Sequence, residues 1–203
     1  SLFEATWRAM REGRNQYPPM AGVPELRSAI GDKVAESYAA EYDMDSEITV
    51  TAGATQAIFT AIAAFVRSGD EVIVFEPVYD SYVPAIETVG GKAVYSRLQF
   101  PDYRPDWNHV KSLIGPRTRM IIVNTPNNPS CSLFTAEDMA TLAELTRDTD
   151  IVVLGDEVYE HICYDGQHQS LCRHPELAAR SIVVSSFGKT YHITGWKVGY
   201  ILA

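Results

Sequence analysis

The sequence predicts a three-layer α/β/α fold, in which helices cover both faces of a mostly parallel, mixed sheet of about seven strands. Two observations support this prediction. Short β-branched, apolar runs alternate along the chain with helical patterns, as in strands joined by helical crossovers. Several of these runs, such as "EVIVFE" and "RMIIVNTP", are apolar almost throughout, which is typical of strands that are covered on both faces.

The individual elements follow from these runs and from the residues that punctuate them. Strands are predicted at 47–52, 71–76, 92–98, 119–126, 151–157, 181–186 and 197–203. Helices are predicted at 25–42, 54–68, 78–90, 106–114, 135–148 and 175–179. The helix at 135–148 opens with "TAED", where Thr135 and an acid three residues later fit a capping box. The helix at 54–68 is expected to stop at Gly69.

The N-terminal stretch has a different character. Residues 1–24 are predicted to be an extended segment, because "GRNQYPPMAGVPEL" is rich in proline and glycine. Residues 25–203 are predicted to form one large domain. The sequence ends on an apolar strand, so we expect this domain to be incomplete and the chain to be part of a longer protein.

Composition narrows the class of protein. With 203 residues, 46% of them hydrophobic, the chain can bury one sizeable core. Its net charge of −9 argues against nucleic-acid or anionic-membrane partners. The apolar stretch at 57–66 is too short to span a bilayer, and no signal peptide is apparent. Three cysteines show neither metal spacing nor an even count. We therefore expect a cytoplasmic protein with reduced thiols and no metal.

Five clusters follow predicted strands, where α/β sheets carry their ligand sites. The first is "TAGATQA" (51–57), a small-residue turn into a helix. Its backbone N–H groups and the Thr55 hydroxyl suit a phosphate or carboxylate, although a plain strand–helix connection would look the same. The second is "EPVYDSY" (76–82), in which Tyr79 is either a stacking surface for a planar ligand or a packing tyrosine.

Two further clusters are polar. "NTPNNPS" (124–130) builds a rigid loop, whose asparagines either donate to a ligand or hold the turn. In "GDEVYEH" (155–161), Asp156 ends an apolar strand, so its carboxylate needs a cation or several donors. That cation could belong to a ligand or to a structural salt bridge. Tyr159 lies three residues further on, within one helical turn if the segment winds.

The last cluster is "SSFGKTYHITGWKVGY" (185–200), which brings a lysine out of a buried strand. A partly desolvated lysine beside other cations is a usable amine nucleophile. The ordinary alternative is a solvated surface lysine. A second lysine, Lys197, follows eight residues after Lys189.

Together, these motifs and their order resemble the class I/II aminotransferases, which are pyridoxal-5′-phosphate (PLP) enzymes of fold type I. The resemblance runs from about Asn15 to the last residue and is carried by "NQYPPMAGVPELR" and the five clusters above. Within the family the chain looks most like the branch of methionine, glutamine–kynurenine and succinyl-diaminopimelate aminotransferases. The resemblance implies an enzyme of amino acid metabolism that moves the amino group of an L-amino acid, of the methionine, glutamine, aromatic or diaminopimelate type, to a 2-oxo acid.

The resemblance also implies roles for individual residues. Lys189 resembles the lysine that bonds to the PLP aldehyde and then moves the substrate Cα proton. Asp156 resembles the carboxylate that faces the pyridine nitrogen and keeps it protonated. The remaining counterparts are Asn128 and Tyr159 at the ring phenolate oxygen, Tyr79 on the ring face, Ala54, Thr55, Ser186 and Lys197 around the phosphate, Asn124 near the substrate carboxylate, and Tyr17, which crosses the interface of a homodimer to the neighbouring subunit's phosphate.

The sequence departs from the family pattern at three points. Lys197 stands where many relatives carry arginine, and lysine lacks the bidentate fork. Cys131 is unexpected after the asparagine–proline turn. The arginine that grips the substrate carboxylate belongs to a C-terminal small domain that we expect to be absent from this chain, so the fragment alone would be incomplete for catalysis.

Other functions share these motifs. A PLP-dependent C–S β-lyase of the cysteine-S-conjugate or cystathionine type is one alternative. A PLP-sensing, aminotransferase-like domain of a transcriptional regulator is another. A plain nucleotide-binding α/β domain would account for "TAGATQA" but leaves Lys189 and Asp156 unexplained.

Overall fold

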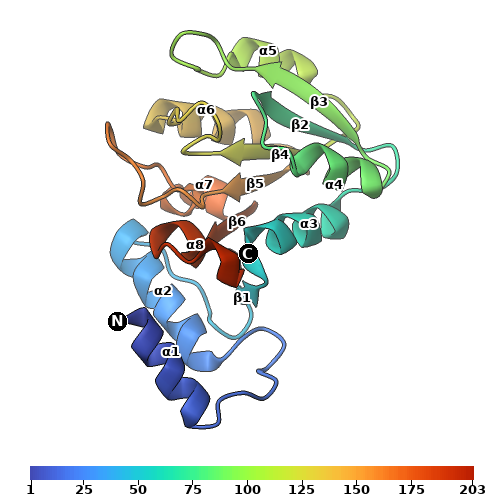
Figure 1. The fold of residues 1–203 in the computed structure, drawn as a ribbon. Coiled ribbons are helices and arrows are strands. Elements are labelled where there is room, and N and C mark those ends of the chain that lie inside the picture. The colour runs from blue at the N-terminus through green and yellow to red at the C-terminus, as the bar shows by residue number, and fades with distance from the viewer.

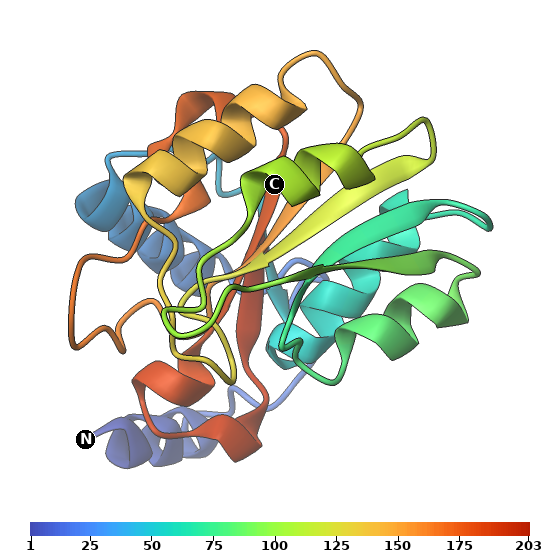
Figure 2. The same ribbon diagram turned by 90° about the horizontal axis from the view of Figure 1, so that it is seen from above.

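The chain folds around one sheet of seven strands that helices cover on both faces (Figures 1 and 2). The computed structural model describes residues 1–203. The strands are β1 (Ile48–Thr51), β2 (Glu71–Glu76), β3 (Lys92–Arg97), β4 (Thr118–Asn124), β5 (Val152–Asp156), β6 (Ser181–Ser186) and β7 (Gly199–Leu202). Their spatial order is β1-β7-β6-β5-β4-β2-β3. The predicted α/β fold is confirmed, and all seven predicted strands are present.

Strand pairing aligns the carboxyl ends of neighbouring strands at one edge of the sheet. From β3 to β6 all adjacent strands are parallel, whereas β7 is antiparallel to both β6 and β1. Asn124 and Asp156, the last residues of β4 and β5, are register partners. Ser186, which ends β6, is paired with Gly199 at the start of β7. This edge is where an α/β sheet presents ligand-binding residues.

The two faces of the sheet form two cores. One face packs against α2 (Pro24–Tyr38), α5 (Trp107–Leu113), α6 (Ala136–Thr146) and α7 (Pro175–Ala178), and the other against α3 (Gly53–Phe65) and α4 (Tyr82–Thr88). Successive strand side chains point to opposite faces, so Val72 and Ile73 enter different cores. This two-sided burial explains why the strands are apolar on consecutive residues.

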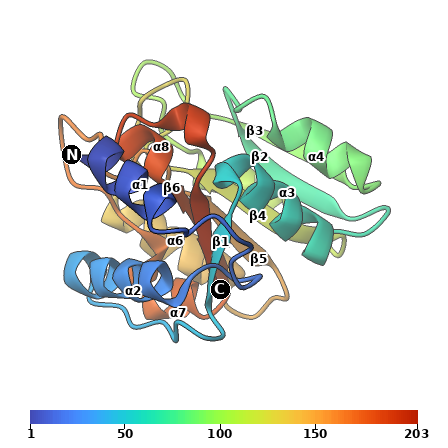
Figure 3. The same cartoon turned by 60° about the horizontal axis from the view of Figure 1, so that its bottom comes forward.

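The N-terminal segment corrects the prediction of extended structure over 1–24. Leu2–Arg11 form helix α1, which begins with a capping box between Ser1 and Glu4. The sequence of α1 combines good helix formers with apolar residues spaced for one helix face, namely Phe3, Trp7 and Met10. None of its residues is buried. Figure 3 shows α1 on the outside of the domain near α8, and Phe3 meets Trp196 with ring centres 5.7 Å apart. Only residues 12–23 remain as loop.

Several helix boundaries also differ from the prediction. Helix α3 ends at Phe65 because Val66 has extended backbone, and Gly69, at φ +89°, lies in the turn before β2. Helix α4 starts only at Tyr82, after a loop that carries Tyr79. The capping box at Thr135 is confirmed. Three short helical elements were not predicted: α8 (Phe187–Thr190), η1 (Leu171–Arg173) and η2 (Thr194–Trp196). None of the helices has the length and apolarity needed to cross a membrane.

Candidate active site

A cavity of about 160 Å³ lies at the carboxyl edge of the sheet. Its sixteen lining residues come from the start of α3, the loop before α4, the ends of β4 and β5, and the segment that runs from β6 through α8 and η2 towards β7. Ten of the predicted site residues lie among them, namely Ala54, Thr55, Tyr79, Asn124, Asn128, Asp156, Tyr159, Ser186, Lys189 and Lys197. The fold thus brings all five sequence clusters to one place.

One predicted residue lies elsewhere, and six lining residues were not predicted. Tyr17 is 99% exposed on the loop after α1 and does not line the cavity. The unpredicted residues are Gly53, Ile58, Val158, Gly188, Thr194 and Val198. All of them except Ile58 lie within the motifs quoted above, so the motifs could have indicated these five residues as well.

Asp156 is the most deeply buried charged group of the cavity. It ends β5 with 3% of its surface exposed. Its Oδ2 accepts a hydrogen bond from the Tyr82 hydroxyl at 2.5 Å, and its Oδ1 accepts a long one from the Val158 N–H at 3.4 Å. Burial raises the pKa of Asp156 to about 6, although both hydrogen bonds act in the opposite direction. No cationic side chain pairs with this carboxylate, so a cationic or proton-carrying ligand atom would relieve its burial.

Asn124 links the ends of β4 and β5 beside Asp156. Its Nδ2 donates to the Asp156 carbonyl oxygen at 2.9 Å, and its Oδ1 accepts from the Asn128 N–H at 2.7 Å. Asn128 in turn directs Nδ2 to the Tyr159 hydroxyl at 3.5 Å. Two polar groups, one from each strand end, therefore meet at a single point of the cavity wall.

The part of the cavity at the start of α3 suits an anion. Helix α3 starts at Gly53, which has φ +78°, and no side chain caps its first turn, so its first N–H groups are free to bind an anion. Lys197 and Ser186 line the same cavity. A Cβ on Gly199 would lie 2.8 Å from the Ala54 nitrogen. Glycine at that position therefore lets β7 approach the start of α3.

Lys189 supplies a primary amine to the same cavity. It is half-buried on α8, directly after β6. Its Nζ lies 5.6 Å from the centre of the Tyr159 ring. One cavity is therefore lined by an amine (Lys189), a buried carboxylate (Asp156), the polar pair Asn128 and Tyr159, and a helix start that suits an anion.

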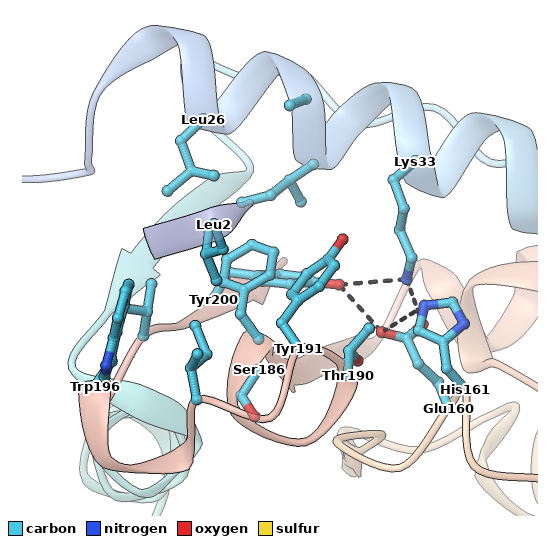
Figure 4. A pocket seen from close by; sticks show the side chains of 15 residues that line it. Leu2, Leu26, Lys33, Glu160, His161, Ser186, Thr190, Tyr191, Trp196 and Tyr200 are labelled. Carbon is cyan, nitrogen blue, oxygen red and sulfur yellow. Dashed lines mark hydrogen bonds and ion pairs between the residues drawn. The ribbon is translucent and has the colours of Figure 1, made fainter. Parts of the chain in front are cut away.

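A second cavity, of about 420 Å³, lies between α2 and α8 (Figure 4). Its walls are mostly apolar, with Leu26, Phe187 and Tyr191 among them. At one end Lys33 forms an ion pair with Glu160, which also accepts a hydrogen bond from Tyr200. Glu160 directly follows Tyr159, so this buried contact anchors the turn that carries the Tyr159 hydroxyl.

Comparison with known proteins identifies a family. The family model described as "Aminotransferase class I and II" matches residues 2–203. The methionine aminotransferase of Escherichia coli is 52% identical over 203 residues, covering 100% of this chain and 53% of its own length. The solved structure of YbdL from Escherichia coli, described as having a methionine aminotransferase function, superposes with a TM-score of 0.98 at 50% identity and covers 100% of this chain and 54% of its own.

A more distant solved structure has the same fold. N-succinyldiaminopimelate aminotransferase from Mycobacterium tuberculosis superposes with a TM-score of 0.96 at 36% identity, covering 99% of this chain and 53% of its own. The chain thus spans about half the length of the relatives it matches.

Proposed function

This chain belongs to the class I and II aminotransferases, and we propose that the protein containing it moves the amino group of an L-amino acid to a 2-oxo acid. Enzymes of this class depend on PLP, which when bound withdraws electrons from the substrate Cα. The observation that carries the proposal is the single cavity that holds Lys189, Asp156 and the start of α3.

The cavity's chemistry fits PLP, which carries a phosphate, an aldehyde, a phenolate oxygen and a pyridine nitrogen. The start of α3 with Lys197 and Ser186 suits the phosphate. The buried carboxylate of Asp156, which accepts a hydrogen bond from Tyr82 but forms no salt bridge, suits a protonated ring nitrogen. The Lys189 amine suits the aldehyde, and Asn128 with Tyr159 suits the phenolate oxygen.

In this proposal each side chain has a defined task. Lys189 would hold the cofactor through its aldehyde carbon and would carry the proton of the substrate Cα. Asp156 would keep the proton on the ring nitrogen. Tyr79 would pack against the ring, and Asn128 and Tyr159 would donate to the ring oxygen. Asn124 has both ends of its amide engaged in hydrogen bonds, so we assign it first to holding Asn128 and second to the edge of the substrate site.

The rest of the protein is also part of the proposal. We propose a cytoplasmic homodimer, in which Tyr17 reaches the partner subunit's phosphate site. The full exposure of Tyr17 and the exposed apolar residues of α1 support such an interface. Residues 25–203 act as the large domain, and a small domain outside this chain supplies the arginine for the substrate carboxylate. Methionine is the first candidate substrate, because the relative at 52% identity is a methionine aminotransferase.

The experiment that tests this function is an assay of the full-length protein with PLP, L-methionine and a 2-oxo acid. Transamination predicts formation of the new amino acid only when the oxo acid is present. An S-alkyl cysteine substrate separates the β-lyase alternative, since pyruvate and ammonia released without an acceptor would overturn transamination as the main activity. A protein that binds PLP but transfers no amine from any of the twenty amino acids would favour the regulator alternative.

A further inference from the structure

The residue that holds Asp156 comes from a distant element. Tyr82 is the first residue of α4, and β4 separates its parent strand, β2, from β5 in the sheet. Its hydroxyl reaches Asp156 Oδ2 at 2.5 Å, yet Tyr82 is 2% exposed and does not line the cavity. Tyr82 belongs to the buried core on the α3 and α4 face of the sheet, so it contacts the carboxylate from the core and not from the cavity lining.

We propose that Tyr82 is a positioning residue of this site, which fixes one oxygen of the Asp156 carboxylate and leaves the other for a donor in the cavity. The inference rests on the proposed PLP function and adds to it a residue that meets no ligand. Tyr82 also meets the ring of Tyr79 edge to face, with centres 5.6 Å apart. One buried side chain thus supports both the carboxylate and the proposed stacking surface.

The direction of the hydrogen bond is fixed by the surroundings. Burial, together with the neighbouring Asp156 carboxylate, raises the pKa of Tyr82 well above its usual value, so the phenol stays protonated and donates. The other charged or titratable groups near Asp156 are Glu157, Tyr79 and Tyr159, with the two lysines on the cavity wall. Only Tyr82 and the Val158 N–H donate to the carboxylate, and the Tyr82 bond is the shorter by 0.9 Å (2.5 against 3.4 Å).

A cofactor analogue separates this role from general support of the fold. The full-length protein would be titrated with PLP and with a PLP analogue that has carbon in place of the ring nitrogen, and the two dissociation constants compared. The wild-type protein should prefer PLP, because the analogue has no protonated ring nitrogen to neutralise the buried Asp156 carboxylate. In the Tyr82→Phe variant the ratio of the two dissociation constants should fall about tenfold, as expected for loss of a hydrogen bond to a charged group.

Two controls make the test decisive. Tyr38→Phe removes another buried tyrosine hydroxyl that donates to a different buried carboxylate, Glu160, and should keep the wild-type preference. In an Asp156→Asn background, Tyr82→Phe should change the preference little, because the group through which it acts is gone.

The outcomes separate an error about the role of Tyr82 from an error about the proposed contact between Asp156 and the cofactor. If Tyr82→Phe weakens PLP and the analogue equally while the wild type prefers PLP, the positioning role is wrong and the proposed function stands. If the wild-type protein binds neither compound, or binds both equally, the contact between Asp156 and the ring nitrogen is wrong, and the role of Tyr82 falls with it.

Discussion

The side-chain amide of Asn124 joins the ends of β4 and β5 by donating to the Asp156 carbonyl oxygen at 2.9 Å. The same amide accepts from the Asn128 N–H at 2.7 Å. Asp156 at the end of β5 and Asn128 in the loop after β4, both proposed to bind the cofactor, are therefore held in a fixed relation by Asn124. Their spacing in the cavity depends on this buried link.

Replacing Asn124 by alanine should lower both stability and cofactor affinity. The change leaves the Asn128 N–H without its partner and leaves the Asp156 carbonyl oxygen with only the Thr125 N–H at 3.3 Å. We expect a cost of about 1–3 kcal/mol in the free energy of unfolding. Denaturant unfolding and PLP titration measure the two effects. Asn127→Ala is the matched control, since Asn127 is equally buried but its Oδ1 bonds only to Ser130. Loss of PLP affinity in both variants alike would show that Asn124 has no special link to the site.

Replacing Asp156 by asparagine should make the cofactor-free protein relatively more stable as the pH rises. The pKa of Asp156 is about 6 in the folded protein, raised by burial from 3.8. Its contribution to stability is therefore fully present below about pH 4 and is lost as the pH rises through 6, by about 3 kcal/mol in all. The Asp156→Asn variant has no ionisable carboxyl at this position, so its stability does not fall in this way as the pH rises.

The measurement is the free energy of unfolding of both proteins at pH 4 and pH 8. The difference between variant and wild type should shift in favour of the variant at pH 8. Asp148→Asn, at an exposed position, should show little shift. A difference that stays constant between the two pH values would contradict the buried, unpaired state of Asp156.

Lys33→Met should destabilise the fold through Glu160. Burial acts to raise the pKa of Glu160, but the Lys33 ammonium and the hydrogen bonds from Tyr38 and Ser185 outweigh it and lower that pKa. The ion pair therefore adds stability above the carboxyl's unfolded pKa and loses it as the pH falls. Without Lys33 the buried carboxylate loses its cation, which should cost about 3 kcal/mol near pH 7.

The double variant Lys33→Met/Glu160→Gln should recover most of that loss, because no buried charge remains. Urea unfolding at pH 7 checks both expectations. A double variant that is no more stable than Lys33→Met alone would mean that the lysine stabilises the fold by packing on α2 and not by neutralising Glu160.

Lys197→Met should weaken PLP binding about tenfold, since a hydrogen bond to a charged group is lost, and should leave pyridoxal binding almost unchanged. Pyridoxal lacks the phosphate that Lys197 is proposed to balance. Methionine keeps the unbranched stem of the lysine side chain and lacks only the charged terminal group, so packing around η2 changes little. Lys197→Arg should bind PLP at least as tightly as the wild type. Equal losses for PLP and pyridoxal would place Lys197 outside the phosphate site.

Much of this arrangement could be predicted because it is local in sequence. Apolar runs marked the seven strands, and topology alone places the residues that follow them, such as Asp156 and Lys189, at one edge. Tyr82 could not be found in this way. It has the pattern of a core tyrosine, and its contact with Asp156 depends on how the start of α4 is placed relative to the end of β5, which is 74 positions away in the sequence.

Long-range polar contacts escaped prediction for the same reason. Lys33 and Glu160 lie 127 positions apart, and the sequence around either residue does not indicate which residue is its partner. Helix α1 was missed because the proline-rich loop after it suggested extended structure for the whole segment, although its capping box and apolar spacing are local signals.

The most direct test of the central claim locates the cofactor on the chain. The full-length protein would be incubated with PLP, treated with borohydride to make any bond between a lysine amine and the aldehyde carbon permanent, digested, and analysed by mass spectrometry. We expect the added cofactor mass on the peptide that contains Lys189, and no added mass there in Lys189→Arg. Labelling of a different lysine such as Lys197, or no specific labelling, would contradict the account.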